Sequence, residues 1–196
     1  MNIIKDSIFA GLILSIAGFA SIKTPTPING IVFSFGLFLI ISLRLSLFTG
    51  NVLKAENGIT KNYIIECIKS YIGNFIGCFI FAYLLTLSCN TDIVLEIAEY
   101  KASLLFLPAI IKGILCNILV CIAVFLSRRC EESINKFICI VIPITLFILC
   151  GFEHSIANMS FFIIAKSNMF NLIPVTIGNI IGGLVVVFMT RKFKSV

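Results

Sequence analysis

Six long apolar stretches alternate with short polar segments along the chain. They lie at about residues 7–22, 28–48, 62–88, 102–127, 137–165 and 170–190. A helix needs roughly 20 apolar residues to cross a bilayer, and each stretch supplies about that many. The pattern predicts an all-α membrane protein with six transmembrane helices, folded as a single domain over residues 1–196.

Polar residues interrupt the second and the fifth of these stretches. The interruptions are the segments Leu47-Phe48-Thr49-Gly50-Asn51 and Gly151-Phe152-Glu153-His154-Ser155-Ile156-Ala157-Asn158. Within a membrane, backbone groups that lack helical partners are tolerated only where they line a cavity. The two segments therefore predict a substrate path near the middle of the membrane, which is typical of channels and transporters.

The two interruptions occur at a regular spacing. Thr49 and His154 are 105 positions apart, and the same distance separates the pentapeptides at residues 73–77 and 178–182, which differ by one substitution. The spacing indicates an internal duplication, in which we expect the side chains of Thr49 and His154 to lie near one another across the path. Repeat one then covers about residues 1–88 and repeat two about residues 100–196.

Composition and charge agree with a membrane protein and exclude other classes. The chain is 59% hydrophobic and 12% charged, with a mean hydropathy of +1.12, which a soluble domain of 196 residues cannot combine with a polar surface. The net charge of +6 does not indicate nucleic-acid binding, because the cations gather in alternate loops. Alternate loops lie on the same side of the membrane, and this cation-rich side is predicted to be cytoplasmic and to hold both termini. Its cations are Lys5, Lys54, Lys61, Lys69, Arg128, Arg129, Lys136, Arg191, Lys192 and Lys194.

Eight cysteines lie mostly within the apolar stretches and form no Cys-x-x-Cys pair. Metal ligands and redox cysteines are usually clustered, whereas isolated cysteines in helices behave as small apolar residues. We expect no metal site and no cofactor.

Three segments resemble the formate/nitrite transporter family of anion channels. They are Leu47-Phe48-Thr49-Gly50-Asn51, Gly113-Ile114-Leu115-Cys116-Asn117-Ile118-Leu119-Val120-Cys121 and, most specifically, Gly151-Phe152-Glu153-His154-Ser155-Ile156-Ala157-Asn158-Met159. The resemblance covers nearly the whole chain. It implies an aquaporin-like fold of two inverted three-helix repeats with broken second and fifth helices, a pore in each protomer and a homopentamer. It also implies transport of small monovalent weak-acid anions, together with protons, across the cytoplasmic membrane, with formate the first candidate and nitrite or hydrosulfide next.

The resemblance implies a substrate pathway as well. The family places a single histidine in the middle of the pore beside a threonine of the other broken helix, and His154 and Thr49 stand at those positions. Asn117 matches an asparagine of the fourth helix, and Lys101 matches a lysine at the outer mouth. Apolar constrictions on either side of the histidine are expected from Phe33 and Phe147 outside it and from Leu37, Leu47, Phe48 and Val120 inside it.

Physical chemistry also makes His154 a candidate. An ionisable side chain in the hydrocarbon region costs roughly 2.5–3.5 kcal/mol on insertion scales, so a lone histidine there is expected to face a cavity. The alternative is a histidine satisfied by a hydrogen bond between helices. Histidine can offer a hydrogen bond when neutral and a proton when charged. Because apolar rings oppose any charged species, we expect a weak-acid anion to take up a proton and cross as a neutral molecule.

Other charged and polar residues near the pathway have competing interpretations. Lys101 is expected to attract anions to the outer mouth, or else only to mark the end of the fourth helix with its charge among the headgroups. Lys112 falls inside the fourth stretch without an evident acidic partner. Glu153 and Asn158 are expected to hold the backbone of the second break by hydrogen bonds.

The chain departs from the family pattern in two places. Relatives commonly carry an acidic residue before Leu-Phe-Thr, whereas this chain has Ser46, with Arg44 two residues earlier. The segment between Asn51 and the third helix is also short, so the second half of the first broken helix is expected to be only a turn or two.

Two other functions agree with parts of the sequence. An aquaporin-like pore for neutral solutes would share the duplicated design, but its paired Asn-Pro-Ala signature is absent from the sequence. A membrane-embedded hydrolase would use Ser155 or Glu153 with His154, yet adjacent residues point in different directions and no further acid or histidine completes a site. We therefore expect a transport protein and not an enzyme, while the physiological anion, the direction of transport and any gating stay open.

Overall fold

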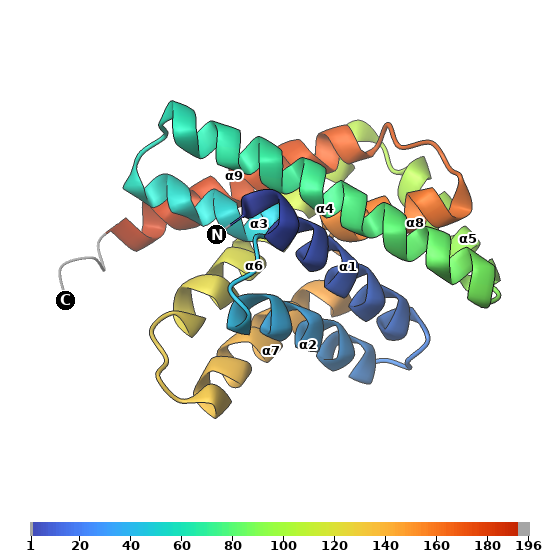
Figure 1. Ribbon diagram of the computed structural model, residues 1–196, viewed down its shortest axis with the longest axis horizontal. Helices are drawn as coiled ribbons and strands as arrows, with labels where there is room; N and C mark the ends of the chain where they lie inside the picture. The colour runs from blue at the N-terminus through green and yellow to red at the C-terminus, as the bar shows by residue number, and fades with distance from the viewer. Residues whose placement is uncertain (1, 192–196) are drawn as a thin grey trace.

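The structure is a computed structural model that describes residues 2–191 (Figure 1). Lys192 and Lys194, expected on the cytoplasmic side, lie outside these residues. The described chain is helical and contains no strand. Its helices are α1 (Ile3–Ile22), α2 (Ile28–Ser42), α3 (Phe48–Asn51), the 3₁₀ helix η1 (Val52–Asn57), α4 (Lys61–Ser88), α5 (Asp92–Ser103), α6 (Phe106–Ser127), α7 (Ser133–Leu149), α8 (Ser155–Ala165) and α9 (Leu172–Thr190).

The apolar stretches of the sequence correspond to these helices, with two breaks and one addition. Helices α1, α4, α6 and α9 are long and apolar enough to cross a membrane. The second stretch is divided into α2 and α3, and the fifth into α7 and α8, as the polar interruptions predict. Helix α5 was not expected, because it lies almost entirely between the third and fourth apolar stretches and mixes acidic with apolar residues.

The backbone reverses in the same way after α2 and after α7. Arg44 has a φ of 54° and Gly151 a φ of 61°, so each break contains one residue in the left-handed conformation. Such a residue ends a helix because it turns the chain away from the helical path. Glycine adopts this conformation without strain, whereas arginine does so at a cost.

Glycines allow the long helices to approach closely. A Cβ atom added to Gly77 of α4 would overlap the carbonyl oxygen of Ile8 in α1, and one added to Gly182 of α9 would overlap that of Ile114 in α6. Membrane helices associate largely through such small-residue contacts. The pairs α1–α4 and α6–α9 thus form two tightly packed units.

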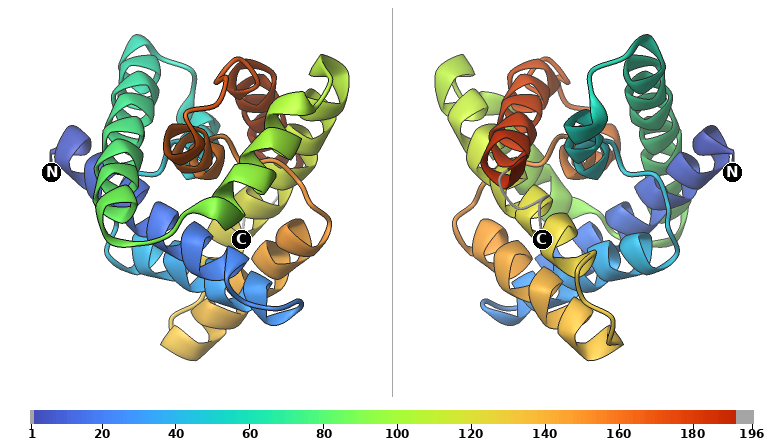
Figure 2. Two further views of the ribbon diagram at one scale, coloured as in Figure 1. Left: turned by 90° about the vertical axis from the view of Figure 1, so that its right-hand side faces the viewer. Right: turned by 90° about the vertical axis from the view of Figure 1, so that its left-hand side faces the viewer.

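The short helices α3 and α8 lie in the interior between these units (Figure 2). All residues of α8 except Ile163 and Ala165 are buried, as are Phe48, Thr49 and Asn51 of α3. A helix that is apolar on every face is stable only where it is covered on every face. The two breaks are therefore enclosed by the long helices.

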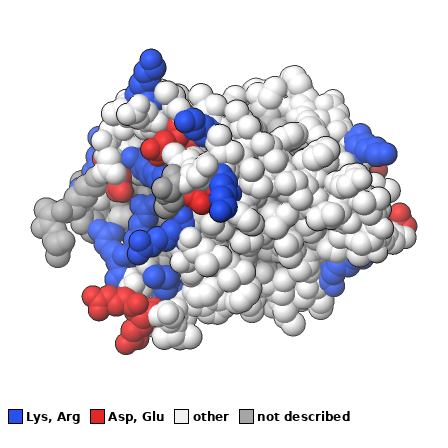
Figure 3. Space-filling model, viewed as in Figure 1, with Lys and Arg blue, Asp and Glu red and all other residues white. Residues whose placement is uncertain are grey.

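The surface is divided into charged ends and an apolar middle (Figure 3). Lysine and arginine gather at the end of the molecule where α9 ends, and a broad belt without charge covers the middle. Large apolar side chains are exposed along the long helices, among them Phe79 and Ile80 of α4 and Phe188 of α9. An apolar belt between charged ends is what a bilayer requires.

Candidate functional site

A buried asparagine holds the first break in place. The Asn74 side chain in α4 accepts a hydrogen bond from the Phe48 N–H (2.9 Å) and donates to the carbonyl oxygens of Ser7 (2.7 Å) and Ser46 (3.0 Å). Backbone groups at a helix end have no helical partners and must be satisfied in another way inside a membrane. Asn74 supplies these bonds to the start of α3.

A second asparagine does the same for the other break. The Asn179 side chain in α9 accepts from the Ser155 N–H (2.9 Å) and donates to the carbonyl oxygens of Gly113 (2.8 Å) and Glu153 (2.9 Å). The spacing of 105 residues noted in the sequence applies to these two asparagines. Each ties a broken helix to a long one.

The same bonds correct the expected register of the breaks. Asn74 accepts from the first residue of α3 and Asn179 from the first residue of α8, so the residue before each helix, Leu47 and His154, occupies the equivalent place. The expectation that Thr49 and His154 are equivalent was wrong by two positions. The chain between the start of the short helix and the asparagine is two residues shorter in the second half than in the first, and the sequence spacing alone does not reveal this.

The structure nevertheless brings Thr49 and His154 together. Thr49 Oγ1 lies 3.0 Å from His154 Nε2, and both side chains are buried. His154 Nδ1 accepts a hydrogen bond from the Ala157 N–H at 3.3 Å and thereby caps α8. Because an accepting nitrogen carries no hydrogen, the ring hydrogen of the neutral histidine is on Nε2 and is donated to Thr49. The Thr49 hydroxyl keeps its own hydrogen for another acceptor.

Asn117 completes the polar group around Thr49. Its amide donates to the carbonyl oxygens of Thr49 (3.2 Å) and Asn179 (2.6 Å), and the Cys121 thiol also approaches the Thr49 oxygen at 3.7 Å. The Asn117 Oδ1 atom is buried without a partner among the described residues.

Lys101 forms a buried ion pair with Glu153. Lys101 Nζ lies 3.0 and 2.9 Å from the two carboxylate oxygens, and the Asn158 amide donates to the same carboxylate at 2.6 Å. The Glu153 side chain is only 1% exposed. The pair ties the end of α5 to the second break. Its net charge is zero, so Lys101 attracts anions less strongly than a free lysine would.

A cavity of about 140 Å³, here called the Lys101 cavity, opens beside this pair. His154 lines it, together with Phe33 and Phe147, whose rings meet edge to face with centroids 5.3 Å apart. The ring of Phe147 also stacks on that of His154 at 6.2 Å. Phe33, Phe147 and His154 thus line the same cavity, with the Phe147 ring in contact with both of the others.

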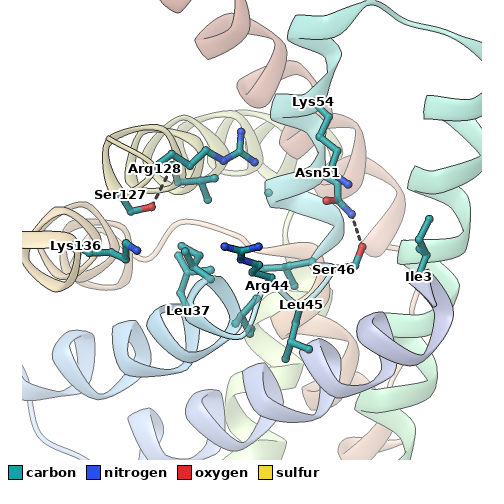
Figure 4. Close-up of a pocket in the computed structure, with 15 residues that line it drawn as sticks. Ile3, Leu37, Arg44, Leu45, Ser46, Asn51, Lys54, Ser127, Arg128 and Lys136 are labelled. Atoms are coloured by element: carbon teal, nitrogen blue, oxygen red, sulfur yellow. Dashed lines mark hydrogen bonds between the residues drawn. The ribbon is translucent and has the colours of Figure 1, made fainter. Parts of the chain in front are cut away.

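A second cavity of about 360 Å³, here called the Arg44 cavity, opens at the end of the molecule rich in cations (Figure 4). Leu37, Leu47 and Gly50 line its inner wall. Since His154 lines the first cavity and the neighbours of Thr49 line the second, the Thr49–His154 pair lies between the two.

Two expected constriction residues lie elsewhere. The ring of Phe48 packs edge to face on Tyr71 at 4.9 Å and lines a third, apolar pocket beside α4 and α9, so it faces away from both cavities. Val120 is buried in the apolar core, 1% exposed, and is among the lining residues of neither cavity.

A hydroxyl network replaces the acidic residue that the family pattern has before Leu-Phe-Thr. The Ser46 and Ser70 hydroxyls are 2.8 Å apart, and the Asn51 amide donates to both, at 2.7 and 2.8 Å. These contacts satisfy the first break without a charge. The break is followed by one turn of α3 and the 3₁₀ helix η1, in agreement with the expected short segment.

The structure also supplies a partner for Lys112. Its ammonium group donates to the Tyr100 hydroxyl at 2.9 Å and lies 5.3 Å from the centre of that ring. Because α6 begins only at Phe106, Lys112 is in its second turn and not deep in a span.

Asn74, Asn179 and Ser70 were missed as site-supporting residues. The sequence did carry a signal for the asparagines, because amides that recur at equivalent places in two apolar helices must be bonded to something.

The family model for formate/nitrite transporters matches residues 1–193 of the chain. Among curated proteins, the formate channel FocA of Escherichia coli (strain K12) is 34% identical over 204 residues, which cover 83% of this chain and 72% of FocA. The probable formate transporter of Methanothermobacter thermautotrophicus is 31% identical over 221 residues, covering 91% of this chain and 81% of that protein.

Solved structures are similar as well. A pentameric formate channel with formate bound matches with a TM-score of 0.82 and 29% sequence identity, covering 97% of this chain and 95% of the other. An ion channel of the FNT family matches with a TM-score of 0.83 and 25% identity, covering 98% and 88%.

Proposed function

The chain belongs to the formate/nitrite transporter family, and we propose that it is a channel for small monovalent weak-acid anions, formate first and nitrite or hydrosulfide next. The observation that carries the proposal is the buried Thr49–His154 hydrogen bond, enclosed between two cavities that open at opposite ends of an apolar molecule. Relatives named as formate channels support formate as the first substrate to test.

The proposed mechanism couples each anion to a proton. Phe33 and Phe147 on one side and Leu37 and Leu47 on the other present apolar surfaces, which a bare anion crosses at a high cost. A weak-acid anion that takes up a proton loses its charge and crosses at a much lower cost. The Thr49 hydroxyl hydrogen is available to hold the carboxylate or nitrite oxygen, while His154 orients that hydroxyl.

The role of the histidine follows from its two bonds. Protonation at Nδ1 would remove the acceptor that caps α8, so the neutral ring is the form that the surrounding bonds stabilise. We therefore assign His154 to hydrogen bonding in the resting site. A proton taken up by the ring would add at Nδ1 and break the bond that caps α8, because Nε2 already carries a hydrogen.

The proposed assembly follows the family. It comprises six membrane spans in two inverted three-helix repeats, with α2–α3 and α7–α8 as the broken second and fifth spans. Five protomers form the ring, each with its own pore, as the pentameric relative suggests. The cation-rich end faces the cytoplasm, with both termini on that side of the cytoplasmic membrane.

The geometry does not favour a hydrolase. Both ring nitrogens of His154 are engaged, one by Thr49 and one by the Ala157 N–H. The Ser155 hydroxyl is buried and has no hydrogen-bond partner among the described residues, so no base activates it. A neutral-solute pore stays the alternative within transport.

Uptake into proteoliposomes tests the proposal. Purified protein is reconstituted, and the entry of formate, nitrite, hydrosulfide and glycerol is followed across a pH series. Flux of the weak-acid anions that rises toward acid pH is the expected result. Glycerol flux without anion flux would assign the pore to neutral solutes instead.

A further inference from the structure

We infer that the Arg44 cavity is a binding site for a compact phosphate-bearing polyanion, such as a diphosphate group, that enters from the cation-rich end and closes the path beneath Thr49. Binding itself is independent of what the channel transports, whereas closure rests on the proposed function. The inference comes from the charges, the walls and the position of the cavity.

Four cations from four separate segments line the cavity. Arg44 lies between α2 and α3, Lys54 in η1, Arg128 after α6 and Lys136 in the first turn of α7. Figure 4 shows their side chains arranged around one opening. None of the described residues that line it is acidic. Such a ring of cations favours a ligand with several negative charges over a single monovalent anion.

Acidic neighbours compensate only part of this charge. Lys54 pairs with Glu66 at 3.4 Å and Arg128 with Glu56 at 3.6 Å, on partly exposed side chains. Within the described part of the chain, Arg44 and Lys136 have no acidic partner within ion-pair distance. The guanidinium group of Arg44 and the ammonium group of Lys136 are thus left to bind an anion from solution.

The two unpaired cations also occupy positions that disfavour them. Arg44 takes a left-handed φ of 54°, which is costly for a residue with a side chain. Lys136 stands in the first turn of α7, where the helix dipole favours anions. Neither placement stabilises the fold, yet both direct a positive charge toward the same space.

The chemistry of the lining points to phosphate oxygens. Arginine binds phosphate through paired N–H groups, and lysine adds a compact charge. The Ser46 and Ser127 hydroxyls and the Asn51 amide also line the cavity, but they are already bonded within the protein, so the cations carry the recognition. A volume of about 360 Å³ holds a small ligand of this class. Leu37 and Leu47 form the inner wall, so a polyanion bound here cannot go further and blocks a smaller one.

Calorimetric titration of the detergent-purified protein with magnesium-free pyrophosphate tests binding. We expect saturable binding that weakens with added salt. In the double variant Arg44→Gln/Lys136→Gln, the affinity is expected to fall by at least about tenfold. Lys166→Gln is the matched control, since it removes one charge at the end of α8 and leaves the cavity unchanged. Equal affinity in all three proteins, or no binding to any, overturns the inference.

Further measurements distinguish the possible sources of the phosphate group and allow for a variant that does not fold. Titration with ADP distinguishes a free diphosphate from a nucleotide, and nanodiscs with or without phosphatidylglycerol show whether a lipid phosphate competes for the site. If the double variant does not fold, Lys136→Gln alone is used, because this side chain is only half-buried and forms no ion pair in the described part of the chain. Formate efflux is then measured with pyrophosphate inside the vesicles. Binding without any formate flux would leave the site standing and remove the proposed function, whereas flux without binding would do the reverse.

Discussion

Leu47 and His154 occupy the same place in the two breaks, each as the last residue before a short helix whose first N–H is held by an asparagine. The two halves thus share their clamp but not the residue that it positions. Only one of them presents a polar ring to the path. The other presents an apolar side chain, and its polar contribution comes from Thr49, two residues later.

Removal of the Thr49 hydroxyl tests the proposed contact with the anion. Thr49→Val keeps the shape of the side chain but leaves His154 Nε2 without its acceptor. Loss of one hydrogen bond of about 1–1.5 kcal/mol predicts a roughly tenfold lower formate flux in proteoliposomes. Thr49→Ser retains the hydroxyl and is expected to keep at least half of the wild-type flux. Equal flux in the valine variant would exclude Thr49 from the path.

Replacement of His154 by asparagine tests the role of the titratable ring. An asparagine side chain can also accept a bond from the Ala157 N–H, so the start of α8 is preserved. We expect folded protein whose formate flux depends on pH differently from the wild type, because the group at the centre no longer titrates. A pH profile of flux that matches the wild type would remove His154 from the mechanism.

The asparagine clamps are expected to stabilise the fold. Asn179→Leu leaves the Ser155 N–H and the Glu153 carbonyl oxygen buried without their partner, at a cost of about 2–4 kcal/mol. The melting temperature followed by circular dichroism should therefore fall clearly. Asn62→Leu, at an exposed position of α4, is the control and should melt as the wild type does. Similar melting of both variants would contradict the clamp.

The Lys101–Glu153 pair is expected to stabilise the fold more than it attracts anions to the cavity. Lys101→Met leaves a buried carboxylate unpaired, which costs about 3–5 kcal/mol, and the yield of folded protein should drop. Adding Glu153→Gln should restore the yield. Since removing both charges leaves the net charge of the cavity unchanged, half-saturation by formate in the double variant is expected within about twofold of the wild type. A several-fold rise in the half-saturating formate concentration would show that Lys101 attracts anions to the cavity.

A thiol cross-link tests the loop between α6 and α7. The sulfur atoms of Cys130 and Cys139 lie 3.4 Å apart. Mild oxidation with copper phenanthroline should join them within one chain, and mass spectrometry of the digested protein should detect the linked peptide. Cys139→Ser should abolish it. If the exposed Cys89 and Cys150 oxidise while this pair stays reduced, the loop is not arranged as described.

Much of the fold was predictable because a membrane imposes a simple rule on the sequence. Four of the apolar stretches became single long helices, and the two with polar interruptions became broken ones. Helix α5 was missed because it lies over the second break at the end of the molecule, and its mixed acidic and apolar residues resemble those of a loop.

The site was predictable in its members more than in its contacts. The proximity of Thr49 and His154 was expected, although the spacing of 105 residues on which this expectation rested differs by two from the alignment of the two breaks in the structure. The bond from Lys101 to Glu153 joins residues 52 positions apart through a helix that the sequence did not reveal, so no local pattern could indicate it. The family resemblance implied that Phe48 forms part of the inner constriction, but its ring packs on Tyr71, because adjacent residues on a single helical turn face different neighbours.

The unequal compensation of charge in the two cavities would make the two directions of transport unequal. Glu153 neutralises Lys101 at one mouth, whereas Arg44 and Lys136 at the other meet no acid in the described part of the chain. Anions would therefore be enriched at one mouth only, and at low anion concentration the uptake from that side would be faster than from the other. In vesicles, the faster direction would report which way each molecule had been inserted.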